Sequence, residues 1–180
     1  MGFRSWFWGF LFLFDFRLNG FDMLPDVAAY LFFAAGFGKM SFASPRLDTA
    51  RKCLPALFLL SIPDLYAPWL QLFPGPVAFV YQLAVLLLGA VFVYQICAAI
   101  KERAEQNGDG ELAGMAQTRG TLYLVMAAIT GVPLLFMGGS HTSVQLPGAS
   151  FPLVIALFVF SLIVLGLLMD LMKKCEVRIG

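Results

Sequence analysis

Three long stretches without a charged side chain dominate the second half of the chain. In residues 77–100 the only strongly polar side chains are Gln82 and Gln95, and residues 121–138 and 151–169 contain no charge at all. About 20 apolar residues cross the hydrocarbon core of a bilayer as a helix. The pattern therefore predicts three membrane-spanning helices, at about 77–100, 119–138 and 151–172.

The first 75 residues carry shorter apolar segments. Arg4 and the apolar run behind it resemble a signal peptide, but no small-residue cleavage site follows, so we interpret the run as a retained first helix. Ser44-Pro45 is typical of an N-cap followed by proline in the first turn, and Pro55 is expected to kink the helix that follows. The predicted helices cover residues 3–18, 24–42 and 45–60.

Composition and the placement of charges predict how these helices are oriented in a membrane. Of the residues, 60% are hydrophobic and 13% charged, against about 25% charged in a soluble domain. With the N-terminus inside and the helices alternating, 11 of the 12 Lys and Arg residues fall on the cytoplasmic side, and Arg17 is the exception. We predict an all-α integral membrane protein: one transmembrane domain over residues 1–180, a six-helix bundle with both termini cytoplasmic and the first three helices short or kinked. A re-entrant segment among those three is the alternative.

The most polar segment lies at 101–118, which we expect to be a cytoplasmic hairpin loop. Asn107-Gly108-Asp109-Gly110 is typical of a turn between two helix extensions. The segment is either simply exposed to solvent or a docking site for a cytoplasmic partner.

Unusual polar chemistry gathers around the first outer turn. Four Asp and one Arg near the hydrocarbon would form an acidic mouth that favours a cation, an amine or a polyol. A glutamine in the fourth helix and the single histidine, in an outer loop, could join it. The candidate ligand-binding residues are Asp15, Arg17, Asn19, Asp22, Asp26, Asp64, Gln82 and His141.

A structural interpretation of the same residues stays open. Asp22 can cap the second helix, with Asp26 in its first turn, where a carboxylate is favoured by the helix dipole. Ser61-Ile62-Pro63-Asp64 fits a capping box. Asp15 and Arg17 can pair at the interface.

The remaining reactive residue types give no firm site. Cys53, Cys97 and Cys175 are widely spaced and are expected at one depth, where they could bind a soft metal or be acylated, although packing is the usual role of buried thiols. One histidine excludes a multi-histidine centre within one chain. We predict no metal and no cofactor, and the net charge of +1 gives no pull towards nucleic acid.

The N-terminal segment resembles a known group of proteins. The residues are Trp8-Gly9-Phe10-Leu11-Phe12, Asp15-Phe16, Asp22-Met23-Leu24-Pro25-Asp26 and Tyr30, with Ala29 where glycine is expected. This run is similar to the start of small uncharacterised polytopic membrane proteins of Gram-positive bacteria. The resemblance implies the cytoplasmic membrane of a bacterium and supplies no activity.

Three functions follow as hypotheses. The leading one is a membrane protein that binds or transports a small polar or cationic molecule through the outer acidic cluster. The second is a non-catalytic subunit or homo-oligomer that packs on another membrane protein through small residues such as Ala28, Ala35, Gly36 and Gly38. The third, an intramembrane enzyme using the Asp cluster, is less favoured because no common catalytic motif is present.

Overall fold

A computed structural model describes residues 2–14, 17–18, 21–22, 24–40, 42–65, 74–137 and 151–179. Within this part of the chain it contains six α-helices, so the all-α class is confirmed, together with one 3-10 turn and two very short strands. The elements are α1 Phe3–Phe12, β1 Arg17–Leu18, β2 Phe21–Asp22, α2 Asp26–Phe37, α3 Pro45–Ser61, η1 Pro63–Leu65, α5 Gly75–Gln106, α6 Gly110–Met137 and α7 Phe151–Arg178.

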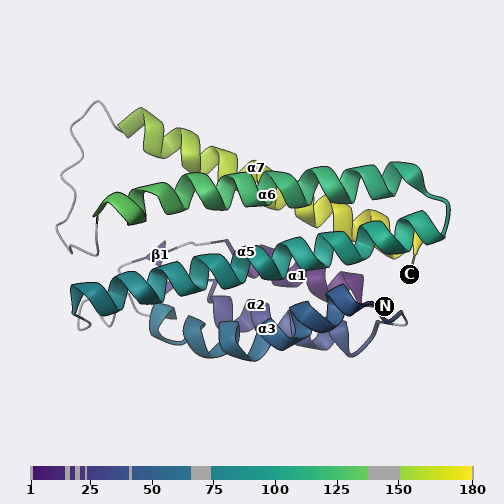
Figure 1. Cartoon of the computed structure of the whole chain (residues 1–180), viewed down its shortest axis with the longest axis horizontal. Coiled ribbons are helices and arrows are strands. Elements are labelled where there is room, and N and C mark those ends of the chain that lie inside the picture. Colours follow the sequence, from purple (N-terminus) through teal and green to yellow (C-terminus); the bar gives the residue numbers. More distant parts are fainter. Residues whose placement is uncertain are drawn as a thin grey trace.

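The helices form a closed ring. Each packs against the next in the order α1, α2, α3, α5, α6 and α7, and α7 returns to α1. In Figure 1 the long helices α5, α6 and α7 run along the long axis, while α1, α2 and α3 lie on one side of them. A ring of this kind gives every helix two neighbours and leaves its outer face uncovered.

Neighbouring helices alternate in direction, which collects the basic residues. Arg46 at the start of α3 pairs with Glu102 near the end of α5, and Arg178 at the end of α7 pairs with Asp109 just before α6. The N- and C-termini lie at this same end in Figure 1. We call it the basic end, because eleven Lys and Arg residues lie at it or in the helical turns nearest it: Arg4, Lys39, Arg46, Arg51, Lys52, Lys101, Arg103, Arg119, Lys173, Lys174 and Arg178.

Several bounds differ from those expected. The first helix ends at Phe12 rather than at residue 18, because Arg17 and Leu18 pair with Asp22 and Phe21 in an antiparallel ladder. The Asn19-Gly20 sequence between the strands is the commonest short hairpin signal. The segment 101–118 is helical except at residues 107–109, where Gly108 takes the left-handed conformation with φ +74°.

Two of the expected caps are wrong and one is confirmed. Ser44 is the N-cap of α3 and accepts a hydrogen bond from the Arg46 backbone N–H. The residue at the N-cap of α2 is Pro25, since Asp22 lies in β2 instead. Ser61 does not begin a helix: it is the last residue of α3, and its hydroxyl donates 2.8 Å to the Phe58 carbonyl.

Within the described residues, two helices are long and apolar enough, by length and composition, to cross a membrane: α5, and the Ile155–Arg178 part of α7. Large apolar side chains are exposed along α5, α6 and α7, among them Leu87, Val125 and Ile163. By contrast, α1 and α2 have 10 and 12 residues and are only about 15 and 18 Å long. The first two helices are therefore too short to cross a hydrocarbon core of about 30 Å on their own.

An aromatic core holds the short helices to the long ones. Trp6 is fully buried and donates its indole N–H 3.1 Å to the Phe33 carbonyl. Phe33 packs edge-on against Phe92 of α5, with ring centroids 5.0 Å apart. Gly36, which we expected on an outward face, is buried against Trp6 with no room for a Cβ. This small residue serves the contact between α1 and α2 within the chain.

Candidate functional site

The predicted acidic cluster is only partly described. Asp15, Asn19 and His141 lie outside the described residues. Arg17 and Asp22 are directly opposite in the β1–β2 ladder, so their backbones are neighbours. η1, which carries Asp64, contacts both β2 and α2. The fold thus gathers three of the predicted segments at the end away from the basic residues.

Asp26 and Asp64 both lie within electrostatic range of Tyr30. Both carboxylates act electrostatically on the Tyr30 side chain, which is 4% exposed, and so does Tyr81 of α5. Asp26 also acts on Tyr123, although Tyr123 belongs to α6 and α2 does not neighbour α6 in the ring. Asp26 itself is half-buried and lies in the first turn of α2.

The depth of Asp26 follows from the contact between α2 and α5. The Phe33–Phe92 contact sets the relative height of the two helices, which run in the same direction. Asp26 precedes Phe33 by seven residues, so it lies about 10 Å farther from the basic end than that contact. On α5 this height corresponds to Val85, which precedes Phe92 by the same seven residues. Val85 is ten residues, about 15 Å, inside the end of α5 that starts at Gly75. Asp26 is thus level with the apolar stretch of α5 and not with its end.

Tyrosines complete this site, and the sequence reasoning missed them. The Tyr81 hydroxyl donates to the Leu60 carbonyl at the end of α3, which ties α5 to the segment that leads to Asp64. Gln82, the next residue, is exposed on α5, so the structure does not bring its side chain to the buried tyrosines. Tyr30 and Tyr123 gave no signal, because single aromatic residues in apolar helices usually belong to the core.

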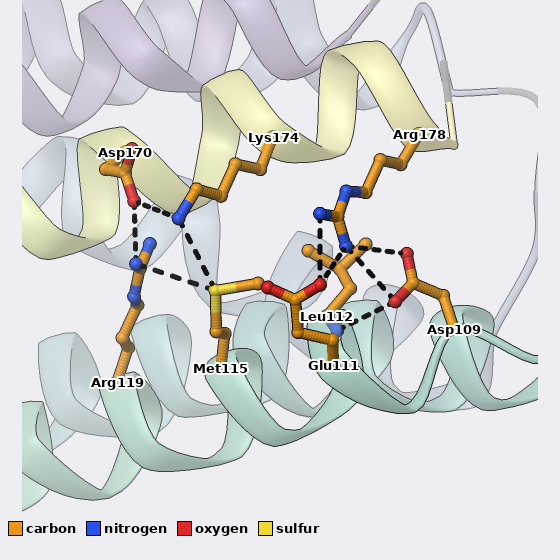
Figure 2. Close-up of polar contacts among 8 residues, drawn as sticks. All are labelled: Asp109, Glu111, Leu112, Met115, Arg119, Asp170, Lys174 and Arg178. Carbon is orange, nitrogen blue, oxygen red and sulfur yellow. Dashed lines mark hydrogen bonds and ion pairs between the residues drawn. The ribbon is translucent and has the colours of Figure 1, made fainter.

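At the basic end, a polar seam joins α6 to α7 (Figure 2). The Arg119 guanidinium donates 2.6 Å to the Leu167 carbonyl and 2.7 Å to Asp170, whose carboxylate also accepts from Lys174 at 3.0 Å. The Arg119 side chain is only 9% exposed. Because it reaches a backbone carbonyl and a carboxylate at once, it fixes the height of α7 against α6.

The end of the same seam is more exposed. Arg178 contacts Asp109 and Glu111, each at 3.1 Å. Asp109 also accepts a 3.0 Å hydrogen bond from the Leu112 backbone N–H and so caps α6. The Leu112 N–H, and then Arg178, hold the pKa of the Asp109 carboxyl below its usual value.

A second polar contact anchors α3 to α5. Glu102 accepts from the Arg46 Nε with one oxygen and from the Ser44 hydroxyl, at 2.9 Å, with the other. Arg46 also donates to the Gln95 side-chain oxygen at 3.5 Å, so Gln95 of α5 bonds a neighbouring helix. All of this chemistry lies at the basic end, away from Asp26.

The cysteines do not form one cluster. Cys97 and Cys175 are buried and close enough to interact electrostatically, whereas Cys53 is half-buried on α3. In the described part of the chain, no group of three His, Cys, Asp or Glu side chains is placed to hold a metal ion. The buried thiols pack between helices, and Cys97 contacts the backbone of α6 at Gly120.

Comparison of the chain with protein-family models, curated proteins and solved structures gives no match.

Proposed function

We propose that the chain is a six-helix transmembrane bundle of a bacterial cytoplasmic membrane, in which α1 and α2 enter the bilayer only part of the way, with the basic end and both termini in the cytoplasm. The exposed apolar side chains of α5, α6 and α7 support a lipid environment, because a soluble protein of this size rarely exposes so continuous an apolar surface. The gathering of Lys and Arg at one end supports the orientation. The N-terminal resemblance supports the bacterial membrane.

We further propose that the protein binds or transports a small cation or amine at Asp26. The observation that carries this proposal is the height of Asp26, which the Phe33–Phe92 contact sets about 15 Å inside the end of α5. A carboxylate at the bilayer centre costs about 2.5–3.5 kcal/mol or more. Ionisable residues at that depth are therefore typical of binding and transport sites.

The surroundings of Asp26 suit a cation. The carboxylate lies in the first turn of α2, where the helix dipole stabilises it, but by at most about 2 kcal/mol. Asp64 adds a second negative charge near the same tyrosine. A bound cation or primary amine would be stabilised by both carboxylates, and the buried faces of Tyr30 and Tyr123 supply the aromatic walls that cations favour.

The proposal is tested by ligand-induced thermal stabilisation of the purified protein in nanodiscs. The panel holds monovalent and divalent cations and primary and quaternary ammonium compounds. A ligand at 100 times its Kd stabilises the folded state by about 2.7 kcal/mol. We expect at least one cation or amine to stabilise the protein, and Asp26→Asn to abolish that shift.

Asp48→Asn is the matched control, because Asp48 also lies in the first turn of a helix but is exposed at the basic end. It should retain the shift. An Asp26→Asn protein that is stabilised as strongly as the wild type would overturn the assignment of the site. Recovery of the protein in the soluble fraction would overturn the membrane assignment.

A further inference from the structure

A groove follows the seam between α5 and α6, and its two parts differ in chemistry. Near the basic end a polar cavity of about 270 Å³ lies between α3, α5 and α6. Farther from that end, an apolar hollow of about 370 Å³ is lined only by Leu, Ala, Gly and Val side chains of α5 and α6. The polar cavity is distinct from the surroundings of Asp26, since none of its lining residues takes part there.

The two parts lie on the same face of both helices. Residues that line them recur at steps of three or four, which is the spacing of one helical face. On α5 they are Leu83, Leu87, Ala90, Tyr94, Ala98 and Lys101. On α6 they are Gln117, Thr121, Leu124, Ala128 and Val132. The polar cavity and the apolar hollow therefore lie in line on one face of the two helices, and we treat them together as one amphipathic groove.

The dimensions match one leaflet of a bilayer. From Tyr94 to Leu83 is eleven residues, a rise of about 16 Å along α5. Half of a hydrocarbon core is about 15 Å. Lys101 lies seven residues, about 10 Å, on the other side of Tyr94, which places the polar cavity at the depth of lipid head groups.

The charges of the polar cavity are balanced. Its lining carries two cations, Arg46 and Lys101, and two carboxylates, Glu102 and Glu105. Both oxygens of Glu102 already accept hydrogen bonds, from Arg46 and from Ser44. The Lys101–Glu105 pair is long, at 3.7 Å, and both side chains are partly exposed. Arg46 and Lys101 can thus contact an anion, while Glu105 remains for a cation.

We propose that this groove binds a phospholipid of the cytoplasmic leaflet whose head group carries both a phosphate and a primary ammonium, as phosphatidylethanolamine does. The phosphate contacts Arg46 and Lys101, the ammonium donates to Glu105, and one acyl chain lies along the apolar hollow. A purely anionic head group would leave Glu105 beside the phosphate, and a choline head group cannot donate the hydrogen bond. The orientation in the membrane rests on the proposed function.

Native mass spectrometry of the detergent-purified chain tests the site. Phosphatidylethanolamine, phosphatidylglycerol and phosphatidylcholine with identical acyl chains are added one at a time. We expect the ethanolamine lipid to be retained about tenfold better than the choline lipid, as expected for one charge-assisted hydrogen bond. Glu105→Gln should remove this preference. Lys101→Gln should weaken the retention of all three lipids, because each carries the phosphate, whereas Lys52→Gln, an exposed change on α3, should not.

The apolar hollow has its own test. Ala128→Phe fills it from an exposed position and should reduce the retention of all three lipids, whereas Ala156→Phe on the exposed face of α7 should not. Equal retention of the three lipids, a preference for the glycerol lipid, or full retention by Ala128→Phe would each overturn the proposal. If the protein still sediments with membranes, any of these negative results would overturn the lipid site and leave the proposed function standing. A soluble protein would overturn the proposed function as well.

Discussion

Replacing Arg119 by Met is expected to destabilise the folded protein far more than the same change at Arg178. Both arginines join α6 to α7, and both contact acidic side chains (Figure 2). They differ in burial, because the Arg119 side chain is 9% exposed and that of Arg178 is 36% exposed. Methionine keeps most of the apolar stem, so each change mainly removes the guanidinium.

The magnitude follows from the partners of Arg119. Its hydrogen bond to the Leu167 carbonyl is charge-assisted and lies in a buried position, so its loss costs about 1.5–3 kcal/mol. The ion pair with Asp170 adds less than about 1 kcal/mol, because that carboxylate is 46% exposed and keeps Lys174 at 3.0 Å. The free energy of unfolding should fall by about 2–3 kcal/mol in total. Arg178 has only exposed partners, so its replacement should have a small effect.

The assay is reversible unfolding by SDS in mixed micelles, with Arg119→Lys as a further variant. Lysine keeps the charge but not the planar fork, so it should recover only part of the loss. A double-mutant cycle with Asp170→Asn separates the ion pair from the carbonyl bond. The reasoning would be refuted if Arg119→Met were neutral, or if Arg178→Met were as costly.

Two further changes test contacts in the half of the bundle nearer the basic end. Gly36→Ala places a Cβ against the Trp6 indole and should cost about 1–3 kcal/mol by overpacking, measured by the same unfolding assay; an unchanged stability would show that α1 can move away freely. Because the pKa of Asp109 is lowered in the folded state by Leu112 and Arg178, its stabilising effect is complete above the ordinary carboxyl pKa and is lost as the pH falls through the lower, folded value. Asp109→Asn should therefore lower stability at neutral pH and flatten its decline in acid; an equally steep decline would contradict this assignment.

The sequence allows the helices to be predicted but not their relative heights. Ser44-Pro45 marks the start of α3 because its cap is a local contact, and the long apolar runs identify α5 and α7 because length and composition suffice. The same local signals predict that α2 starts near the outer surface of the membrane. Its true height depends on the packing of Phe33 against Phe92, residues far apart in the chain. No pattern within one helix contains that information.

The same limit applies to the candidate site. The Asp-rich segment was visible, but its capping residues were misassigned, since Asp22 pairs in a strand and Ser61 ends a helix. Tyr30 and Tyr123 could not be singled out, because their significance comes from their electrostatic contact with Asp26, which lies far from Tyr123 in the sequence. A carboxylate within an apolar bundle becomes recognisable as a candidate only when its depth and its neighbours are known together.

The short first helices explain why such a carboxylate exists in this fold. α1 ends near Phe158, seven residues after the start of α7, and α2 begins about 15 Å inside the end of α5. In the described residues, the half of the bundle away from the basic end is therefore walled mainly by α3, α5, α6 and α7. A helix that starts inside such a wall must present its first backbone N–H groups and its positive dipole end to the interior. Interrupted helices create binding sites in this way at the midplane of transporters. The truncation of α2 explains the depth of Asp26, because the dipole of the helix stabilises a carboxylate there; the cation site that we propose rests on the charges of Asp26 and Asp64 and not on the helix N-terminus.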